Sequence, residues 1–286
     1  MRILFVTAAN ESFAPLLRGL VHSLQQWQPL PYTALACFDL GLSLTTRQWI
    51  AQYAAHIIEP GWDLPVSDTL RVQQPHARAL TVRPFLPKHF PGYDIYMWID
   101  ADCWVQERYA LDGYLNAAAN GQLGIAAEVH HAYRHSRSLF IWRAKRLHRY
   151  FGMESAQRLS WATYFNAGVF ALHADAPHWA RWQHAFETGL EAAEGTLCCD
   201  QTALNYMLWT ENLPRSHMPA TCNWLCHLAP PVYDASRQRF CEPAMPNHPL
   251  GILHLAADSK DIRISVRHAK DTHEMGLHFP GLRLAV

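Results

Sequence analysis

The chain has 286 residues and 50% hydrophobic content, enough apolar material for one large α/β domain or two small ones. Lys and Arg together number 24, as do Asp and Glu, so there is no net positive charge to attract nucleic acid. No apolar run approaches the roughly 20 residues of a transmembrane helix, and the first residues lack the composition of a secretion signal. A cytoplasmic protein with reduced cysteines is expected.

The N-terminal part of the chain alternates between short apolar runs and segments in which apolar residues have helical spacing. Strands are expected at residues 2–7, 32–40 and 56–58, and helices at 10–23 and 45–53. Strands and helices in alternation predict parallel strands joined by right-handed crossovers. The expected fold class is therefore α/β, with a mostly parallel central sheet flanked by helices.

The rest of the chain continues this pattern less regularly. Pro84 and Pro87 interrupt a helical or irregular segment at 75–90. Further strands are expected at 95–99, 123–127 and 164–172, and further helices at 111–119, 179–193 and 200–208. Asp200 is placed to act as the N-cap of the last helix. After Arg215 the chain is rich in Pro, His and Cys and has little periodicity, so irregular structure is expected there.

Two aspartates, Asp100 and Asp102, stand at the end of the apolar strand expected at 95–99. Residues two apart in an extended chain point the same way, so both carboxylates are expected on one side. Such a pair repels unless a cation lies between its members, and a buried strand excludes charge that has no partner. Mg²⁺ and Mn²⁺ take oxygen ligands of this kind and often bring substrate phosphates with them. The motif indicates a metal–diphosphate site, although Asp-x-Asp alone is also common on solvated turns.

Two segments carry groups suited to a phosphate or a sugar. Arg83 lies upstream of the aspartates, and a guanidinium is well shaped for bidentate phosphate contact. Within the apolar run 164–172, the Asn166 amide can donate and accept hydrogen bonds, and Gly168 lets the backbone approach a ligand closely. The plain alternatives are a surface Arg and a buried strand with a bulge at its Gly.

Three further landmarks complete the pattern. Asn10 follows the first strand, and Asp200-Gln201 opens the helix at 200–208. Near the C-terminus, His254 ends an apolar run and Lys260 follows it. Asn and Asp are also common helix caps, and a lone His after a strand is more often structural than metal-binding.

In chain order these landmarks resemble the GT-A glycosyltransferases. They resemble most closely the retaining, metal-dependent family, glycosyltransferase family 8, that includes bacterial lipopolysaccharide galactosyltransferases and glycogenin. The resemblance extends from about Ile3 to Lys260. It implies a single GT-A domain over 1–286, with a nucleotide-binding half at 1–110, a donor-sugar and acceptor half at 111–265 and a C-terminal tail at 266–286.

The resemblance also assigns roles to residues. It implies that Asp100, Asp102 and His254 hold Mn²⁺ or Mg²⁺, and that Arg83 and Lys260 contact the diphosphate of a nucleotide-sugar donor, with a UDP-sugar as the expected donor. The remaining implied donor-binding and catalytic residues are Asn10 at the base and ribose, Asn166, Ala167 and Gly168 at the donor sugar, and Asp200 and Gln201 at the anomeric carbon.

The implied reaction transfers the sugar to a hydroxyl group of a glycan, glycolipid or protein acceptor. No carboxylate general base is evident from the sequence, which favours retention of the anomeric configuration. Peripheral contact with the inner face of a membrane is expected where the acceptor is lipid-linked.

The chain departs from the family pattern at several positions. Ala8 and Ala9 stand where an acidic residue is usual near Asn10, which weakens the identification of uridine as the base. Ala257 replaces the Gly that usually follows the metal-binding His by three residues. Asp261-Ile262 replaces the Pro-Trp that often follows the Lys.

Two alternative functions stay open. A sugar nucleotidyltransferase usually carries a Gly-rich basic loop after its first strand, and residues 7–13 contain neither Gly nor Lys. A non-catalytic protein of the same fold, binding a carbohydrate or a partner, would tolerate the departures at Ala8, Ala9 and Ala257. Metal-dependent hydrolysis of a nucleotide sugar would exclude this second alternative, and a complete failure to bind Mn²⁺ or nucleotide would support it.

Overall fold

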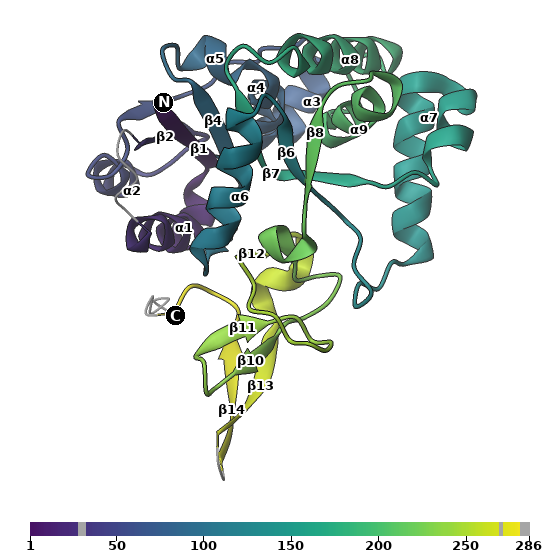
Figure 1. Cartoon of the computed structure of the whole chain (residues 1–286). Coiled ribbons are helices and arrows are strands. Elements are labelled where there is room, and N and C mark those ends of the chain that lie inside the picture. The colour runs from purple at the N-terminus through teal and green to yellow at the C-terminus, as the bar shows by residue number, and fades with distance from the viewer. Residues whose placement is uncertain (28–32, 269–270, 281–286) are drawn as a thin grey trace.

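The computed structural model describes residues 1–27, 33–268 and 271–280, and its centre is a seven-stranded sheet (Figure 1). In order across the sheet the strands are β3 (His56–Ile58), β2 (Thr33–Asp39), β1 (Ile3–Ala9), β4 (Ile95–Ile99), β7 (Phe165–His173), β6 (Leu123–Ala127) and β8 (Arg215–Met218). β7 is antiparallel to both of its neighbours, and every other pairing in the sheet is parallel. The predicted α/β class with a mostly parallel central sheet is confirmed.

Helices cover both faces of the sheet. Alternate residues of β4 therefore pack into two separate hydrophobic cores, one on each face. Tyr96 and Trp98 pack in one core, and Ile95, Met97 and Ile99 pack in the other. A strand buried on both faces has a continuous apolar sequence. The α-helices are α1 (Ala14–Gln26), α2 (Leu44–Ile50), α3 (Asp68–Gln73), α4 (Arg78–Val82), α5 (Leu86–His89), α6 (Arg108–Ala119), α7 (Arg137–Leu159), α8 (His178–Ala192) and α9 (Asp200–Thr210). The 3₁₀ helices are η1 (Glu11–Phe13), η2 (Pro75–Ala77), η3 (Arg83–Phe85), η4 (Ala220–Asn223) and η5 (Ala257–Asp261).

A second, three-stranded sheet lies next to the central one. It contains β5 (Cys103–Val105), β12 (Ile252–His254) and β9 (Trp224–Leu225), with β12 in the middle. β12 is antiparallel to β5, and His254 lies opposite Cys103. Two hairpins belong to the same region, β10 (Val232–Asp234) with β11 (Arg239–Cys241) and β13 (Arg263–His268) with β14 (Asp271–Gly276) (Figure 1). The β5–β12 pairing brings the C-terminal part of the chain to the residues that follow β4.

Most predicted elements are present with shifted ends, but some expectations differ from the structure. Tyr32, the expected start of the second strand, lies outside the described residues. The prediction that Asp200 is the N-cap of α9 is wrong, because Cys199 occupies the N-cap and Asp200 is the first helical residue. The region after Arg215, expected to be irregular, contains β8 to β14. The boundary expected between residues 265 and 266, where the C-terminal tail was to begin, falls inside β13.

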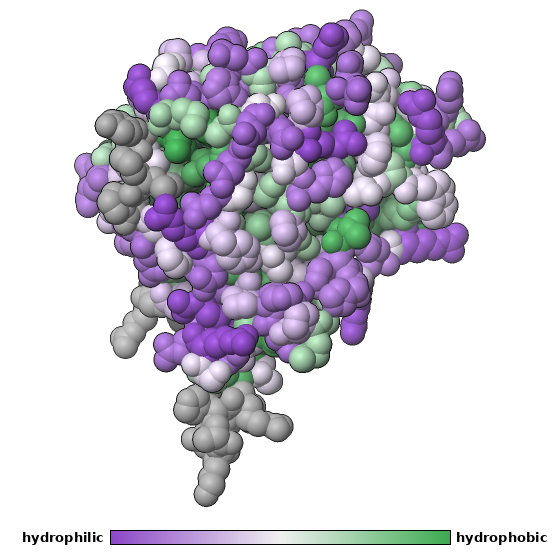
Figure 2. Space-filling view, viewed as in Figure 1, coloured by the Kyte–Doolittle hydropathy of each residue, from purple (hydrophilic) through white to green (hydrophobic). Residues whose placement is uncertain are grey.

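No helix in the described part of the chain is both long and apolar enough to cross a membrane. The face seen in Figure 2 is largely hydrophilic, with small separate apolar patches. Most of the large apolar side chains are buried in the hydrophobic cores.

Ala257 has a left-handed backbone conformation, with a φ of +54° at the start of η5. An L-residue costs about 1–2 kcal/mol in this region, whereas glycine adopts it freely. The turn requires a left-handed backbone at this position, and glycine is the residue that adopts this conformation freely. The turn between His254 and Lys260 is therefore kept at an energetic cost.

We expect Ala257→Gly to raise the free energy of unfolding by up to about 1 kcal/mol, because relief of the left-handed strain exceeds the added chain entropy of glycine. Chemical denaturation of the ligand-free protein measures the change. Ala256→Gly is the matched control, because Ala256 has a φ of −64° and a ψ of 156°. There we expect a loss of about 0.5–1 kcal/mol. Equal effects of the two substitutions would contradict the strain at Ala257.

Candidate active site

The chain turns sharply after β4, and this turn presents the two aspartates. The Cys103 N–H donates to the carbonyl of Asp100 at 2.9 Å, and the Asp100 N–H donates to the carbonyl of Gly168 at 2.8 Å. Ile99 is the last residue of β4, so Asp100 and Asp102 are not both in an extended strand. The expectation that an extended strand aligns the two carboxylates is therefore wrong, because the aspartates lie in a turn after the strand. The turn brings them together instead.

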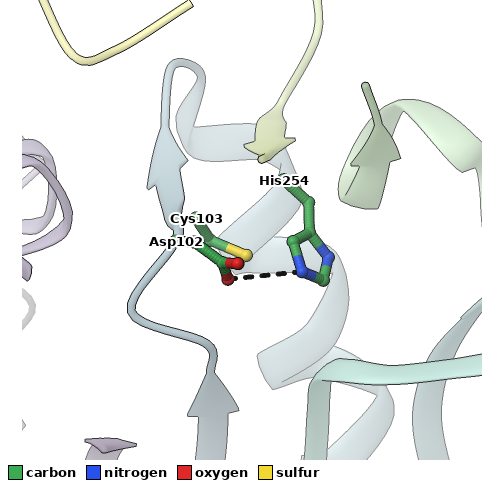
Figure 3. Close-up of side chains that lie close together, drawn as sticks. All are labelled: Asp102, Cys103 and His254. Carbon is green, nitrogen blue, oxygen red and sulfur yellow. Dashed lines mark ion pairs between the residues drawn. The ribbon is translucent and has the colours of Figure 1, made fainter. Parts of the chain in front are cut away.

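The imidazole of His254 faces both carboxylates. Its Nε2 lies 3.8 Å from Asp100 Oδ2 and 3.4 Å from Asp102 Oδ1. Figure 3 shows the His254 ring directed toward Asp102 across the end of the turn. The Leu255 N–H donates to the carbonyl of Asp102 at 2.8 Å, which fixes the two segments against each other. The structure thus brings together the three residues to which the resemblance assigns the metal.

Asn223 orients the His254 ring. Asn223 Oδ1 lies 2.9 Å from His254 Nδ1, and Asn223 Nδ2 donates to Asn166 Oδ1 at 3.0 Å. With its amide so oriented, Asn223 Oδ1 accepts a hydrogen bond from Nδ1–H, so the lone pair of the neutral ring is on Nε2 and faces the carboxylates. A backbone or side-chain acceptor behind the ring is typical of histidines that bind metals.

The charges at this site are balanced by neighbouring groups. Burial opposes a charge on His254, but the hydrogen bond and the charge of Asp102 outweigh it, so the pKa of His254 is raised. Burial likewise opposes ionisation of Asp102, but His254 and Lys260 outweigh it, so the pKa of Asp102 is lowered. The position between Nε2 and the carboxylates therefore attracts positive charge, either a proton or a metal ion.

Gly168 lets the His254 ring and the Asp100 carboxylate pack directly against the backbone. A Cβ at this position would collide with Cε1 of His254 and would lie 2.7 Å from Asp100 Oδ2 and 2.9 Å from Asn166 Oδ1. Any larger residue would displace the ring or the carboxylate. Two carboxylate oxygens and one imidazole nitrogen are ligands that suit a hard divalent ion that also binds phosphate oxygens. The residues present therefore fit Mn²⁺ or Mg²⁺.

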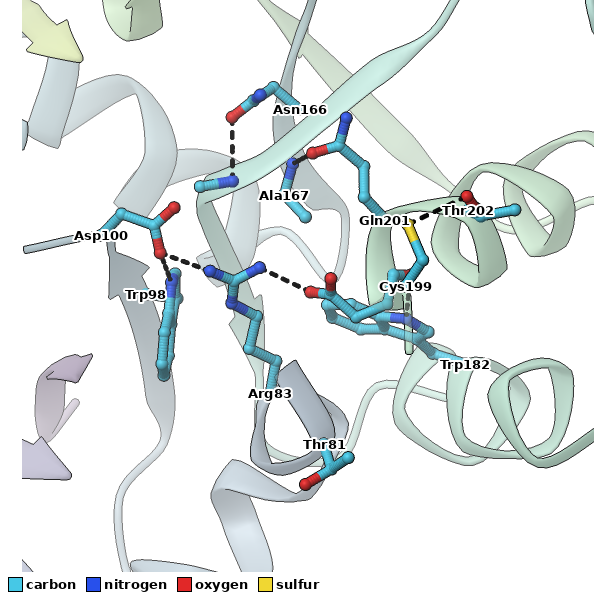
Figure 4. A network of polar contacts seen from close by, with 12 residues as sticks. Thr81, Arg83, Trp98, Asp100, Asn166, Ala167, Trp182, Cys199, Gln201 and Thr202 are labelled. Atoms are coloured by element: carbon cyan, nitrogen blue, oxygen red, sulfur yellow. Dashed lines mark hydrogen bonds and ion pairs between the residues drawn. The ribbon is translucent and has the colours of Figure 1, made fainter. Parts of the chain in front are cut away.

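Arg83 connects the two acidic groups of the site. Its Nη1 donates to Asp200 Oδ2 at 2.6 Å, and its Nη2 donates to Asp100 Oδ1 (Figure 4). Its guanidinium lies over the Trp98 ring, at 4.8 Å from the centroid, and Trp98 Nε1 donates to the same Asp100 oxygen at 2.7 Å. Burial opposes the charge on Arg83, but Asp100 and Asp200 outweigh it and raise its pKa. In this arrangement Arg83 positions two carboxylates.

A carboxylate that the sequence analysis missed, Glu128, lies at the centre of a second network. Glu128 Oε1 accepts from Asn166 Nδ2 at 2.9 Å and from Gln201 Nε2 at 3.0 Å, and Arg143 of α7 pairs with Oε2. Glu128 directly follows the buried strand β6. This is the same signal, an acidic residue immediately after an apolar strand, that identified Asp100.

Gln201 is also tied to the strand that carries Asn166-Ala167-Gly168. Gln201 Oε1 accepts from the Ala167 N–H at 3.1 Å, and Asn166 Oδ1 accepts from the Gly168 N–H at 2.9 Å (Figure 4). The predicted donor-sugar residues and Gln201 therefore form one hydrogen-bonded unit. It continues through Asn223 to His254.

Lys260 contacts the second oxygen of the Asp102 carboxylate. Lys260 Nζ is 2.9 Å from Asp102 Oδ2 and donates to the carbonyls of Leu255 and Ala257 at 2.9 and 3.1 Å. It also lies 5.2 Å from the centroid of the Phe13 ring.

Asn10 is used locally as a cap. Its Oδ1 accepts from Ser12 Oγ at 2.7 Å and from the Phe13 N–H at 3.3 Å, at the start of η1. The contact between Lys260 and the Phe13 ring places this turn beside the carboxylate side of the site. The structure thus brings the turn after β1 close to Lys260, while the Asn10 oxygen is occupied within the turn.

A second group of metal-ligand types, His130, His131 and Glu242, lies elsewhere in the described residues. His130 Nδ1 accepts from the Ala132 N–H at 3.1 Å, so the proton of the neutral ring is on Nε2. Nε2 lies 2.8 Å from Glu242 Oε2 and donates to it. Since Nε2 has no lone pair to offer, this group is a hydrogen-bonded cluster rather than a metal site.

No family model matches the chain, and no curated protein matches it. Among solved structures, the galactosyltransferase LgtC in complex with donor and acceptor sugar analogues has a TM-score of 0.56 and 17% identity, over 90% of this chain and 88% of LgtC. An active-site mutant of LgtC has a TM-score of 0.54 and 16% identity, over 89% and 87% of the two chains.

The bifunctional glycosyltransferase WbbM has a TM-score of 0.56 and 13% identity, over 90% of this chain and 46% of WbbM. The chain thus matches less than half of that larger protein, whereas it matches LgtC over most of both lengths. These likenesses show that the chain has the GT-A fold predicted from its sequence.

Proposed function

We propose that this protein is a metal-dependent glycosyltransferase that moves a sugar from a nucleotide-diphosphate sugar, a UDP-sugar, to an acceptor hydroxyl with retention. The observation that carries the proposal is the position of His254 Nε2, which faces the carboxylates of both Asp100 and Asp102 where Gly168 allows close packing. The three ligands come from two distant parts of the sequence, and Asn223 holds the ring with its lone pair toward them. The fold shared with LgtC and WbbM supports the same assignment.

Asp100, Asp102 and His254 would hold Mn²⁺ or Mg²⁺. When bound, such an ion supplies Lewis-acid stabilisation of the negative charge on the departing diphosphate. The Lys260 side chain is 26% exposed and sits at Asp102, so it can turn toward a phosphate without leaving the site. Lys260 is therefore the cation that we assign to direct diphosphate contact.

We revise the role of Arg83, which the resemblance placed against the diphosphate. Both ends of its guanidinium are occupied by carboxylates, so we assign it to holding Asp100 and Asp200 apart and in place. Asp200, kept in position in this way, would accept hydrogen bonds from hydroxyls of the donor sugar.

The unit formed by Asn166, Ala167, Gly168 and Gln201 would border the donor sugar. Gln201 would present its amide to the anomeric carbon, where a retaining reaction needs a weak nucleophile or a polar group that stabilises the cationic transition state. Glu128 is the carboxylate that accepts hydrogen bonds from Asn166 and Gln201 of this unit. Its oxygens are occupied by Arg143 and two amide groups, so we assign it to positioning Gln201 and Asn166 rather than to taking a proton.

The alternative of a non-catalytic protein loses one of its arguments. Ala257 takes up the left-handed conformation that a glycine would have, so its presence leaves His254 and Lys260 in contact with Asp102. The acceptor that we propose is a glycan, glycolipid or protein. The cytoplasmic location, and contact with a membrane where the acceptor is lipid-linked, belong to the same proposal.

The test of the proposed function is a thermal-shift screen of nucleotide sugars with and without Mn²⁺. A ligand at 100 times its dissociation constant adds about 2.7 kcal/mol, so we expect a clear rise in melting temperature when both are present. The variant D100N/D102N should lose the shift. Release of free sugar or nucleotide diphosphate from the bound donor, followed by chromatography, reports turnover. Binding of the donor without any metal dependence would contradict the proposal.

We expect Asn223→Ala to weaken Mn²⁺ binding by about 10–100-fold, because the His254 ring loses the partner that fixes its orientation. Isothermal titration calorimetry measures the affinity. The melting temperature of the metal-free variant serves as the control for folding. An unchanged Mn²⁺ affinity in a folded variant would show that Asn223 does not position the ring.

We expect Gly168→Ala to abolish measurable Mn²⁺ binding, because the added methyl group fills the space between His254 and Asp100. The same calorimetric titration measures this loss. Gly61→Ala is the matched control, since a Cβ at Gly61 meets nothing within 4 Å and its φ is not in the left-handed range. Full Mn²⁺ affinity in Gly168→Ala would place the ion elsewhere.

A further inference from the structure

Cys103 adds a sulfur atom to the proposed metal site. Its Sγ, a carboxylate oxygen of Asp102 and a ring nitrogen of His254 all lie within 4.8 Å of one another. Figure 3 shows the sulfur beside the line that joins Asp102 to His254. Cys103 is 1% exposed, so the thiol belongs to the interior of the site rather than to the surface.

The backbone explains why two consecutive residues face the same ring. Neighbouring residues of a strand point to opposite sides, but Asp102 lies in the turn and only Cys103 begins β5. In the β5–β12 pair, Cys103 lies directly opposite His254. The turn and the strand pairing therefore direct Asp102 and Cys103 to the same imidazole from adjacent positions.

The three groups form a donor set different from that of a hard cation. Lys260 occupies Asp102 Oδ2, so Oδ1, at 3.4 Å from His254 Nε2, is the oxygen available to an ion. One oxygen, one imidazole nitrogen and one thiolate are typical ligands of Zn²⁺ and of the softer Cd²⁺. With metal–ligand bonds of roughly 2.0–2.3 Å, closing the set around an ion needs side-chain shifts of about 1 Å.

We propose that the site has two overlapping donor sets and that Cys103 makes it a binding site for thiophilic ions. A hard ion uses Asp100, Asp102 and His254, and this part rests on the proposed function. Zn²⁺ or Cd²⁺ uses Asp102, Cys103 and His254 instead. As the ion binds, the S–H bond of Cys103 breaks, the sulfur donates its electron pair to the metal, and the proton passes to solvent.

The two sets exclude each other because both need Asp102 and His254. N, O and S ligand sets generally bind Zn²⁺ more tightly than Mn²⁺, so a low concentration of Zn²⁺ displaces the hard ion. The consequence is a transferase that Zn²⁺ inhibits by competition with its own metal. A residue without a ligand atom at position 103, such as Gly, would leave only the donor set of Asp100, Asp102 and His254.

The test uses the whole chain and Cd²⁺ alone. Titration of the metal-free wild type should produce a sulfur-to-cadmium charge-transfer band in the ultraviolet that saturates at one equivalent. Cys103→Val should lose this band, and its affinity for Cd²⁺ should fall by at least roughly tenfold. Cys37→Val, which removes a buried thiol on β2, should keep the band. Calorimetric competition should show that Cd²⁺ prevents Mn²⁺ binding.

Cys103→Ser provides a second variant of similar size, should Cys103→Val fail to fold. A band that persists in either folded variant, or no band in the wild type, would overturn the inference. A failure of the proposed function would be seen separately from a failure of this inference. If the wild type forms the cadmium band but binds neither Mn²⁺ nor a nucleotide sugar, the thiophilic site stands and the transferase does not.

Discussion

The arrangement of this protein depends on compensating the charges of Asp100 and Asp102, which follow a buried strand and both face His254 Nε2. Two charges so close to the core need compensation from opposite charges. Arg83 pairs with Asp100, and Lys260 and His254 pair with Asp102. These partners come from the segment before β4 and from the C-terminal part of the chain. The second sheet is required because it carries His254 to this point.

A continuous set of hydrogen bonds links the residues proposed to hold the metal to those proposed to border the donor sugar. It passes from His254 through Asn223 and Asn166 to Glu128, and from there to Gln201. Each amide in this chain both donates and accepts, so its orientation is determined by its neighbours. A change at one end therefore disturbs groups at the other end. The arrangement suits a site in which metal, diphosphate and sugar must be aligned together.

Several site residues were predictable from local sequence signals, and others were not. Asp100 was predictable because an acidic residue directly follows a fully apolar strand. Glu128 follows β6 in the same way, but no second acidic residue lies two positions from it to form a recognisable motif. The direction of the Arg83 side chain was not predictable, since a guanidinium serves a phosphate and a carboxylate equally well. Asp200 resembled a helix cap, but its partner is Arg83, which is distant in sequence.

The sequence by itself determined the α/β class, the central parallel strands and the position of the paired acids, because these depend on hydrophobic periodicity and on residues that are close in the chain. The tertiary structure decided which groups surround those acids. The turn at Asp100–Cys103, the pairing of β5 with β12 and the contact of Glu128 with Gln201 join residues far apart in sequence. No periodicity encodes such contacts, because they arise only when separate elements pack around a common core.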